Sequence, residues 1–208
     1  MKRRASPRLG GLQATPLALG LLMGLTLGLL SAPGIAQAKK GDTRSGLFVG
    51  STRYFLKGDT TVGTTFGLML SYEVVEDLEL RLAGSYAATE GTHTQDGFEY
   101  PLTARTTTVR LGTTYFFNRA PNALAVVFAG GGVSMLSYSI DHTYPGSLVN
   151  QVSGTAPGGY LHMGAELKLT KSMTLIPVYE YQAHVLSRDA GGMAIYSTGF
   201  LLTLRISG

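Results

Sequence analysis

The sequence predicts an all-β fold, an eight-stranded antiparallel transmembrane barrel with up-and-down topology. Three observations lead to this prediction. Segments of about ten residues in which apolar and polar side chains alternate recur along the chain after residue 38. The connections between these segments alternate between short and long. Finally, the faces opposite the apolar ones carry charged residues, which a dry protein core does not accommodate.

The composition points away from a soluble protein. Only 14% of the 208 residues are charged, whereas a typical soluble domain has about 25%. The chain contains no cysteine, so it forms no disulfide. Four of its seventeen basic residues and none of its thirteen acidic residues lie in residues 1–38, which leaves thirteen of each sign in the remainder. We therefore expect no nucleic-acid partner.

Residues 1–38 have the features of a secretory signal peptide. A basic start from Lys2 to Arg8 is followed by an apolar run over residues 16–30 and by the small residues Ala36 and Ala38. The apolar run is shorter than the roughly 20 residues of a membrane-spanning helix. We expect cleavage after Ala38, which leaves residues 39–208 as a single barrel domain.

The alternating segments define the expected strands, and no segment after residue 38 has the spacing of an amphipathic helix. The clearest hairpin flanks the polar turn at residues 170–172. Residues 129–133 (AGGGV) do not alternate, and their glycines predict a bent wall or close backbone contact. The eight expected strands are 46–56, 64–74, 78–88, 103–117, 123–139, 160–169, 173–184 and 193–206.

The connections between the expected strands fall into three length classes. Those at 75–77, 118–122 and 170–172 are short, those at 90–101 and 140–155 are expected to be long loops, and those at 57–63 and 185–192 are intermediate. Short turns at one end and long loops at the other are typical of outer-membrane barrels. The short-turn end is assigned to the periplasm, and the long loops are assigned to the outside of the cell.

The two faces of the strands are assigned by polarity. Charges should line a polar lumen and apolar side chains should face lipid, because closure leaves no unpaired backbone in the membrane. The predicted lipid face comprises Phe48, Tyr54, Phe66, Leu68, Leu70, Tyr72, Val74, Leu78, Leu80, Leu82, Tyr86, Val109, Leu111, Tyr115, Phe117, Tyr196, Phe200, Leu202, Leu204 and Ile206. The predicted lumen face carries Arg53, Glu73, Glu79, Arg81, Arg110, Glu166, Lys168, Glu180 and Arg205.

This layout resembles the small bacterial outer-membrane β-barrel proteins of the OmpX and OmpW type. The resemblance rests on the eight segments, on residues 78–86 (LELRLAGSY) and 164–182 (GAELKLTKSMTLIPVYEYQ), and on a glycine in the last strand. It implies a place in a Gram-negative outer membrane, with lipid, lipopolysaccharide and the assembly machinery as partners. Family members usually end on an aromatic residue, whereas this chain ends on Gly208.

The sequence indicates no metal site, cofactor or enzyme. His93, His142, His162 and His184 are not spaced as metal ligands. His184 and Ser187 are three residues apart, but the resembling lipid A deacylases have a closer spacing. A lipid A-modifying enzyme is therefore the minor alternative.

The lumen charges are expected to form an ion-pair network, because an eight-stranded barrel has little free interior. Its expected members are Glu73, Glu79, Arg81, Arg110, Glu166, Lys168, Glu180 and Arg205. The six that lie near the short turns, Glu73, Glu79, Arg81, Glu166, Lys168 and Arg205, are expected to close the periplasmic half. Two functions remain open. The first is a structural or surface-interaction barrel whose loops contact an extracellular partner through Phe98, Tyr100 and Tyr144. The second is a narrow channel for small or hydrophobic solutes.

Overall fold

The computed structural model describes residues 41, 43–56, 59–95, 97–117, 123–144, 148–170, 173–185 and 194–207. The predicted signal peptide and its cleavage site lie outside these residues. Within the described ranges, no helix is long and apolar enough to cross a membrane.

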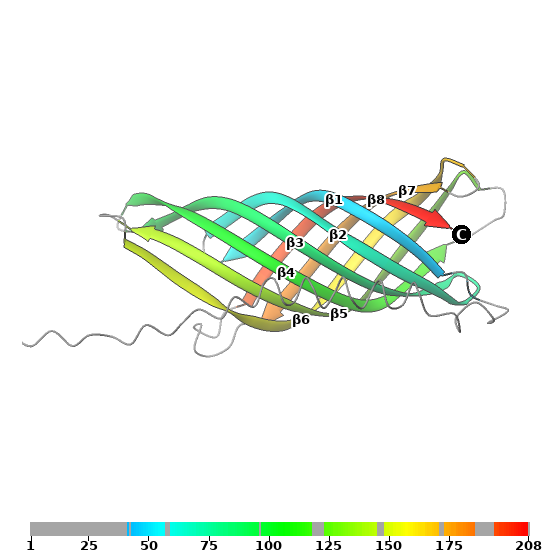
Figure 1. The fold of residues 1–208 in the computed structure, drawn as a ribbon, viewed down its shortest axis with the longest axis horizontal. Helices are drawn as coiled ribbons and strands as arrows, with labels where there is room; N and C mark the ends of the chain where they lie inside the picture. The colour runs from blue at the N-terminus through cyan, green and yellow to red at the C-terminus, as the bar shows by residue number, and fades with distance from the viewer. Residues whose placement is uncertain are drawn as a thin grey trace, which may run out of the picture. The chain divides into compact units, whose positions relative to one another are not determined.

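The described residues form one closed barrel in which each strand pairs antiparallel with its neighbours in sequence and β1 pairs with β8 (Figure 1). This arrangement confirms the predicted eight-stranded up-and-down topology. The strands are β1 (Thr43–Leu56), β2 (Asp59–Val75), β3 (Leu78–Gln95), β4 (Phe98–Phe117), β5 (Ala125–Tyr144), β6 (Leu148–Lys168), β7 (Met173–Val185) and β8 (Ala194–Ser207).

The register sets how wide the barrel is. A path from Arg44 on β1 through successive Cα partners around the barrel returns to β1 at Tyr54, ten residues further along the strand. A stagger of this size in eight strands tilts them by roughly 40–45° from the barrel axis. The resulting interior is just wide enough for side chains to fill it.

The outward face is apolar on most strands, as the alternation predicts. Phe66 on β2, Leu111 on β4 and Phe200 on β8 are all exposed on the outer surface. These side chains come from strands in which only one face is strongly apolar. The period of two therefore identified their direction correctly.

The predicted direction of β1 was wrong. Phe48 and Tyr54 point into the barrel and are each only 3% exposed, whereas Leu47 and Val49 are exposed on the outside. Arg53, which was expected in the lumen, is exposed too. Both faces of β1 carry apolar side chains, so polarity does not distinguish them; the pairing with β2 and β8 decides the direction.

The predicted long loops at 90–101 and 140–155 were also wrong, because both are mainly strand. β3 continues to Gln95, and β4 begins at Phe98; β5 continues to Tyr144, and β6 begins at Leu148. The alternation weakens there because polar residues such as threonine occupy both faces, yet threonine and valine favour extended backbone. Figure 1 shows β3 to β6 reaching past β7 and β8 at one end. We call residues 88–95, 98–105, 138–144 and 148–157 the projecting sheet.

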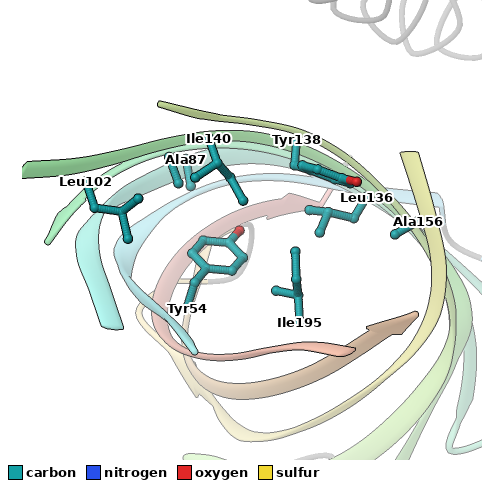
Figure 2. Close-up of a cluster of buried hydrophobic side chains, with 9 residues drawn as sticks. Tyr54, Ala87, Leu102, Leu136, Tyr138, Ile140, Ala156 and Ile195 are labelled. Atoms are coloured by element: carbon teal, nitrogen blue, oxygen red, sulfur yellow. The ribbon is translucent and has the colours of Figure 1, made fainter. Parts of the chain in front are cut away.

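Two apolar clusters fill much of the lumen. The inner cluster lies toward the short-turn end, and the outer cluster lies toward the projecting sheet, where Figure 2 shows its side chains pointing into the barrel. On β3 the order Ala83, Ser85, Ala87 places a polar position between the two clusters. The inner cluster comprises Phe48, Met69, Ala83, Phe116, Val126, Phe128, Ile176, Val178 and Leu201. The outer cluster comprises Tyr54, Ala87, Leu102, Ala104, Leu136, Tyr138, Ile140, Ala156 and Ile195.

Candidate functional site

A chain of five charged side chains crosses the lumen near the short-turn end. Arg44 contacts Glu73 at 2.9 Å and Glu79 at 2.5 Å. Arg205 contacts the other oxygen of Glu79 at 3.2 Å and also pairs with Glu166. Signs therefore alternate along the series, and its members come from β2, β1, β3, β8 and β6. We call these five residues the ionic layer.

Arg44 is the member of the ionic layer that the sequence analysis missed. It precedes the expected start of the first strand at residue 46, and it shares a face with Phe48, which was assigned to lipid. Placing Phe48 inward would have placed Arg44 in the lumen as well. The missed residue and the wrong direction of β1 are therefore one error.

A second ion pair lies further along the lumen, between the two apolar clusters. Arg110 donates from Nη1 to Glu180 and from Nη2 to the Ser85 hydroxyl at 2.8 Å. Gln182 donates to the same Glu180 oxygen at 2.7 Å. The guanidinium carbon of Arg110 also lies 5.3 Å from the centre of the Phe48 ring. All of these groups are buried, so the pair is desolvated. Both donors meet at one oxygen of Glu180, while Glu180 Oε2, Arg110 Nε and Gln182 Oε1 have no hydrogen-bond partner among the described residues.

Arg81 has no ion pair with a described residue, unlike Arg44, Arg110 and Arg205. It is 4% exposed, and its Nε and Nη2 atoms have no hydrogen-bond partner among the described residues. The Tyr160 hydroxyl is unpartnered in the same sense. Gly112, the Cα partner of Arg81 on β4, makes room for that hydroxyl, because an added Cβ would come within 2.7 Å of it. The Arg81 guanidinium and the Tyr160 hydroxyl are thus both buried with unpartnered polar atoms among the described residues.

The eight residues expected to form one network fall into separate groups. Four of them, Glu73, Glu79, Glu166 and Arg205, join Arg44 in the ionic layer, and Arg110 and Glu180 form their own pair. Arg81 belongs to neither group, because it forms no ion pair with a described residue. Lys168 is exposed rather than buried in the lumen.

The glycine run on β5 serves close packing, one of the two roles expected of it. An added Cβ at Gly130 would lie 2.7 Å from the ring of His162. That ring stacks on Tyr160 with a centroid distance of 5.5 Å and an interplanar angle of 16°. The two large side chains from β6 therefore occupy space that larger residues on β4 and β5 would fill.

The two lumen histidines hydrogen-bond to hydroxyl groups. His162 Nε2 lies 2.9 Å from Thr114 Oγ1, and His184 Nε2 lies 2.9 Å from Ser134 Oγ. His184 is fully buried, and its Nδ1 has no acidic partner among the described residues. Ser187 lies outside the described residues. The serine–histidine contact thus lacks both an orienting acid and access for a substrate.

The other two histidines meet on the projecting sheet, which their spacing in sequence did not indicate. The rings of His93 on β3 and His142 on β5 are 5.3 Å apart and nearly perpendicular. His93 Nδ1 also lies 2.7 Å from the carboxylate of Asp59 on β2. Burial and the nearby His93 lower the pKa of His142. No group of three potential ligands among the described residues is placed to hold a metal ion.

The expected surface contacts lie on the projecting sheet instead of in loops. Phe98 is 67% exposed at the start of β4, and Tyr100 is half-buried two residues later. The side chain of Tyr144 lies outside the described part of the structure. Gly97, with φ of +80°, turns the chain between β3 and β4, because Gln95 and Phe98 are already Cα partners.

Comparison with known proteins gives one family and several similar folds. The family model described as "Outer membrane protein beta-barrel domain" matches residues 23–205. Neisserial surface protein A is 14% identical, with a TM-score of 0.54 over 82% of this chain and 100% of that chain. A major outer membrane protein from Thermus thermophilus is 11% identical, with a TM-score of 0.56 over 78% of this chain and 99% of that chain. No curated protein matches the chain.

Proposed function

This chain is an outer-membrane protein of the outer membrane protein beta-barrel domain family, and on that premise we propose that it is a non-conducting surface barrel. Its filled lumen gives a stable support in the lipid, and its projecting sheet contacts partners outside the cell. Family membership confirms the resemblance inferred from the sequence. The short-turn end then faces the periplasm, and the projecting sheet lies outside the cell.

One observation carries this proposal: the lumen is crossed by side chains at successive levels. The ionic layer links five strands near the periplasmic end. The inner and outer apolar clusters occupy the levels on either side of the Arg110–Glu180 pair. A hydrated ion would have to displace paired charges and then pass apolar side chains that cannot replace its water. These obstacles favour a support over a channel.

The proposal includes no catalytic activity. The Ser134–His184 contact is the described arrangement closest to a nucleophile and its base, and both side chains are buried inside the lumen. A lipid A-modifying enzyme needs its serine or histidine at the barrel rim, where lipid can reach it. The buried position of this pair therefore argues against a lipid A-modifying enzyme.

We also propose that export removes residues 1–38 and that lipopolysaccharide and the assembly machinery are partners of the mature barrel. The outward apolar side chains, such as Leu111 and Phe200, support contact with lipid. Mass spectrometry of the protein from an outer-membrane fraction should find Lys39 as the first residue. Retention of the apolar run at 16–30 would contradict the cleavage.

Conductance in planar lipid bilayers tests the main proposal. The mature protein, residues 39–208, should give no steady openings, while a porin reconstituted in parallel shows that the assay detects them. Steady openings of reproducible size would overturn the proposal and support the narrow channel. A useful variant is Glu79→Ala combined with Arg205→Ala, which removes the centre of the ionic layer but leaves both apolar clusters. If the clusters alone suffice to close the lumen, this variant should also stay silent.

A further inference from the structure

Several polar atoms are buried in the lumen without a hydrogen-bond partner among the described residues. They include Nε and Nη2 of Arg81, Nε of Arg110, the Tyr160 hydroxyl, Oε2 of Glu180 and Oε1 of Gln182. We call these five residues the polar layer; none of them is more than 6% exposed. Native proteins leave few buried polar groups unpartnered, because each one gives up its hydrogen bonds to water on folding. The polar layer therefore needs a partner that the described chain does not supply.

The register brings Arg81 and Tyr160 into one row with only glycines between them. Arg81 on β3 is the Cα partner of Gly112 on β4. Gly112 is the partner of Gly132 on β5, which in turn pairs with Tyr160 on β6. The Tyr160 hydroxyl reaches back over this row, because a Cβ added at Gly112 would lie 2.7 Å from it. The two glycines thus leave the space beside Arg81 to polar side chains from other strands.

The charges of the polar layer are not balanced. Arg81 is close enough to Glu180, Arg110 and Tyr160 to interact with them electrostatically. The carboxylate of Glu180 is already paired with Arg110. Two arginines and one glutamate leave one net positive charge in the layer, and that charge belongs to Arg81. A buried charge without a counter-charge is strongly unfavourable, so a negatively charged partner fits this position best.

The ionic layer does not provide this counter-charge. Each of its three carboxylates contacts an arginine of the same layer. The acid at its end, Glu73, has a side chain that is 26% exposed, so its charge is nearest to water. Of the ionic-layer residues, Arg205 has the strongest electrostatic effect on Arg81, and it carries the same sign. The ionic layer therefore presents a further positive charge to Arg81.

We propose that the polar layer binds one small monovalent anion, such as chloride, between Arg81 and the Tyr160 hydroxyl. Nε and Nη2 lie on one edge of a guanidinium and can donate to a single acceptor, and both of these atoms are unpartnered in Arg81. Tyr160 adds a neutral donor, and Arg110 Nε adds a second positively charged one. The apolar clusters fill the neighbouring levels of the lumen, which favours a monatomic anion over an organic one.

The anion would act as a structural ligand and would not pass through the barrel. Arg81 and Tyr160 are only 4% and 3% exposed, so the anion would enter while the barrel folds and would then remain enclosed. A ligand that binds only the folded state stabilises that state. This inference goes beyond the proposed surface function, because it concerns a ligand inside the lumen.

Unfolding by urea in matched salts tests the proposal. The mature protein is folded into lipid vesicles in sodium chloride or in sodium methanesulfonate of equal concentration, so that general screening is the same. At about 0.5 M salt, chloride should raise the folding equilibrium constant about threefold to fivefold over methanesulfonate. Arg81→Met should abolish this difference. The matched control is Arg105→Met, which removes an exposed arginine of the projecting sheet and should keep the full chloride effect.

Tyr160→Phe provides a second variant in case Arg81→Met fails to fold. It retains the ring that stacks on His162 and removes only the hydroxyl, so it should reduce the chloride effect. A chloride effect in Tyr160→Phe equal to that of the unmodified protein would overturn the site. Equal stability of the unmodified protein in the two salts would overturn it as well, since water alone would then occupy the polar layer.

Bromide gives a direct measurement of position. Crystals of the mature protein, folded and grown in sodium bromide, should show an anomalous scattering peak at the Nε and Nη2 edge of Arg81, and crystals of Arg81→Met should lack it. Absence of the peak from the unmodified protein would overturn the proposal. Because both apolar clusters remain in place with or without the anion, neither result changes the expected absence of conductance. Failure of this inference is therefore distinguishable from failure of the proposed function.

Discussion

The membrane-spanning barrel and the projecting sheet are built from the same strands but satisfy their backbone and side chains in opposite ways. Within the barrel, each strand has a partner on both sides, and buried charges reach across the lumen to one another. In the projecting sheet, residues 148–157 of β6 have a strand on one side only among the described residues, and the exposed side chains of Gln151, Ser153 and Thr155 are uncharged and polar. Closure satisfies the backbone in the first region, whereas the second region leaves part of one strand without a neighbouring strand among the described residues.

The comparison predicts that charge removal is costly only inside the barrel. Glu79→Ala should lower the free energy of unfolding by about 3–5 kcal/mol, because the buried Arg205 and the half-buried Arg44 lose their shared partner. Glu99→Ala, at an exposed position of the projecting sheet, should change it by less than about 0.5 kcal/mol. Urea unfolding of the protein in lipid vesicles measures both. Similar losses in the two variants would remove the distinction between the regions.

A new charge on the outer surface should destabilise the two regions to different extents, because lipid surrounds the barrel and water surrounds the projecting sheet. Leu111→Arg should destabilise the barrel by about 2–4 kcal/mol if that part of β4 lies near the bilayer midplane, because the guanidinium would enter lipid. Thr92→Arg on the projecting sheet should have an effect close to zero, since its side chain is exposed beyond the barrel. The same urea titration in vesicles compares them. Equal tolerance of both substitutions would show that the lipid face is assigned incorrectly.

Two buried arginines within the lumen, Arg81 and Arg110, should respond differently to the loss of their charge. Arg81→Met should lower the free energy of unfolding by no more than about 1 kcal/mol, or should raise it. The reason is that an apolar side chain of similar length replaces a desolvated charge that has no ion pair. Arg110→Met should cost about 3–5 kcal/mol, since it leaves Glu180 charged and buried. Urea unfolding of both variants in lipid vesicles measures the two changes in stability. A larger loss for Arg81→Met would indicate that its charge has a partner of comparable strength.

The smallest expected effect is a pH response of the projecting sheet. His142 faces His93 on β3, with Asp59 on β2 and the adjacent Asp141 as the nearby acids. Because the pKa of His142 is lowered in the folded state, its contribution to stability is present above the ordinary value of about 6.5 and is lost as the pH falls below it. Proteolysis of the projecting sheet should therefore accelerate between pH 7.5 and 5, and less so in His142→Gln. Measuring both proteins at each pH cancels the pH dependence of the protease. An identical response in both would exclude His142 as the cause.

The sequence by itself determined the number of strands and the barrel. Alternation is a property of a single strand, and where one face is clearly apolar, as around Phe66, Leu111 and Phe200, it gives the direction of the side chains without knowledge of any partner. The same local signal predicted that Glu79, Arg110, Glu166 and Arg205 face inward. It predicted the short turns as well, because they interrupt the alternation abruptly.

The tertiary structure decided which of these side chains meet. Arg44 and Glu79 are 35 residues apart, and Glu79 and Arg205 are 126 residues apart, so their contacts depend on the register of several strands around the barrel. The direction of β1 and the meeting of His93 with His142 depend on the same register. The sequence did not predict the length of the projecting strands, for a different reason. Polar residues such as threonine occupy both faces of these strands beyond the barrel, so the alternation that marks a strand in the sequence weakens there.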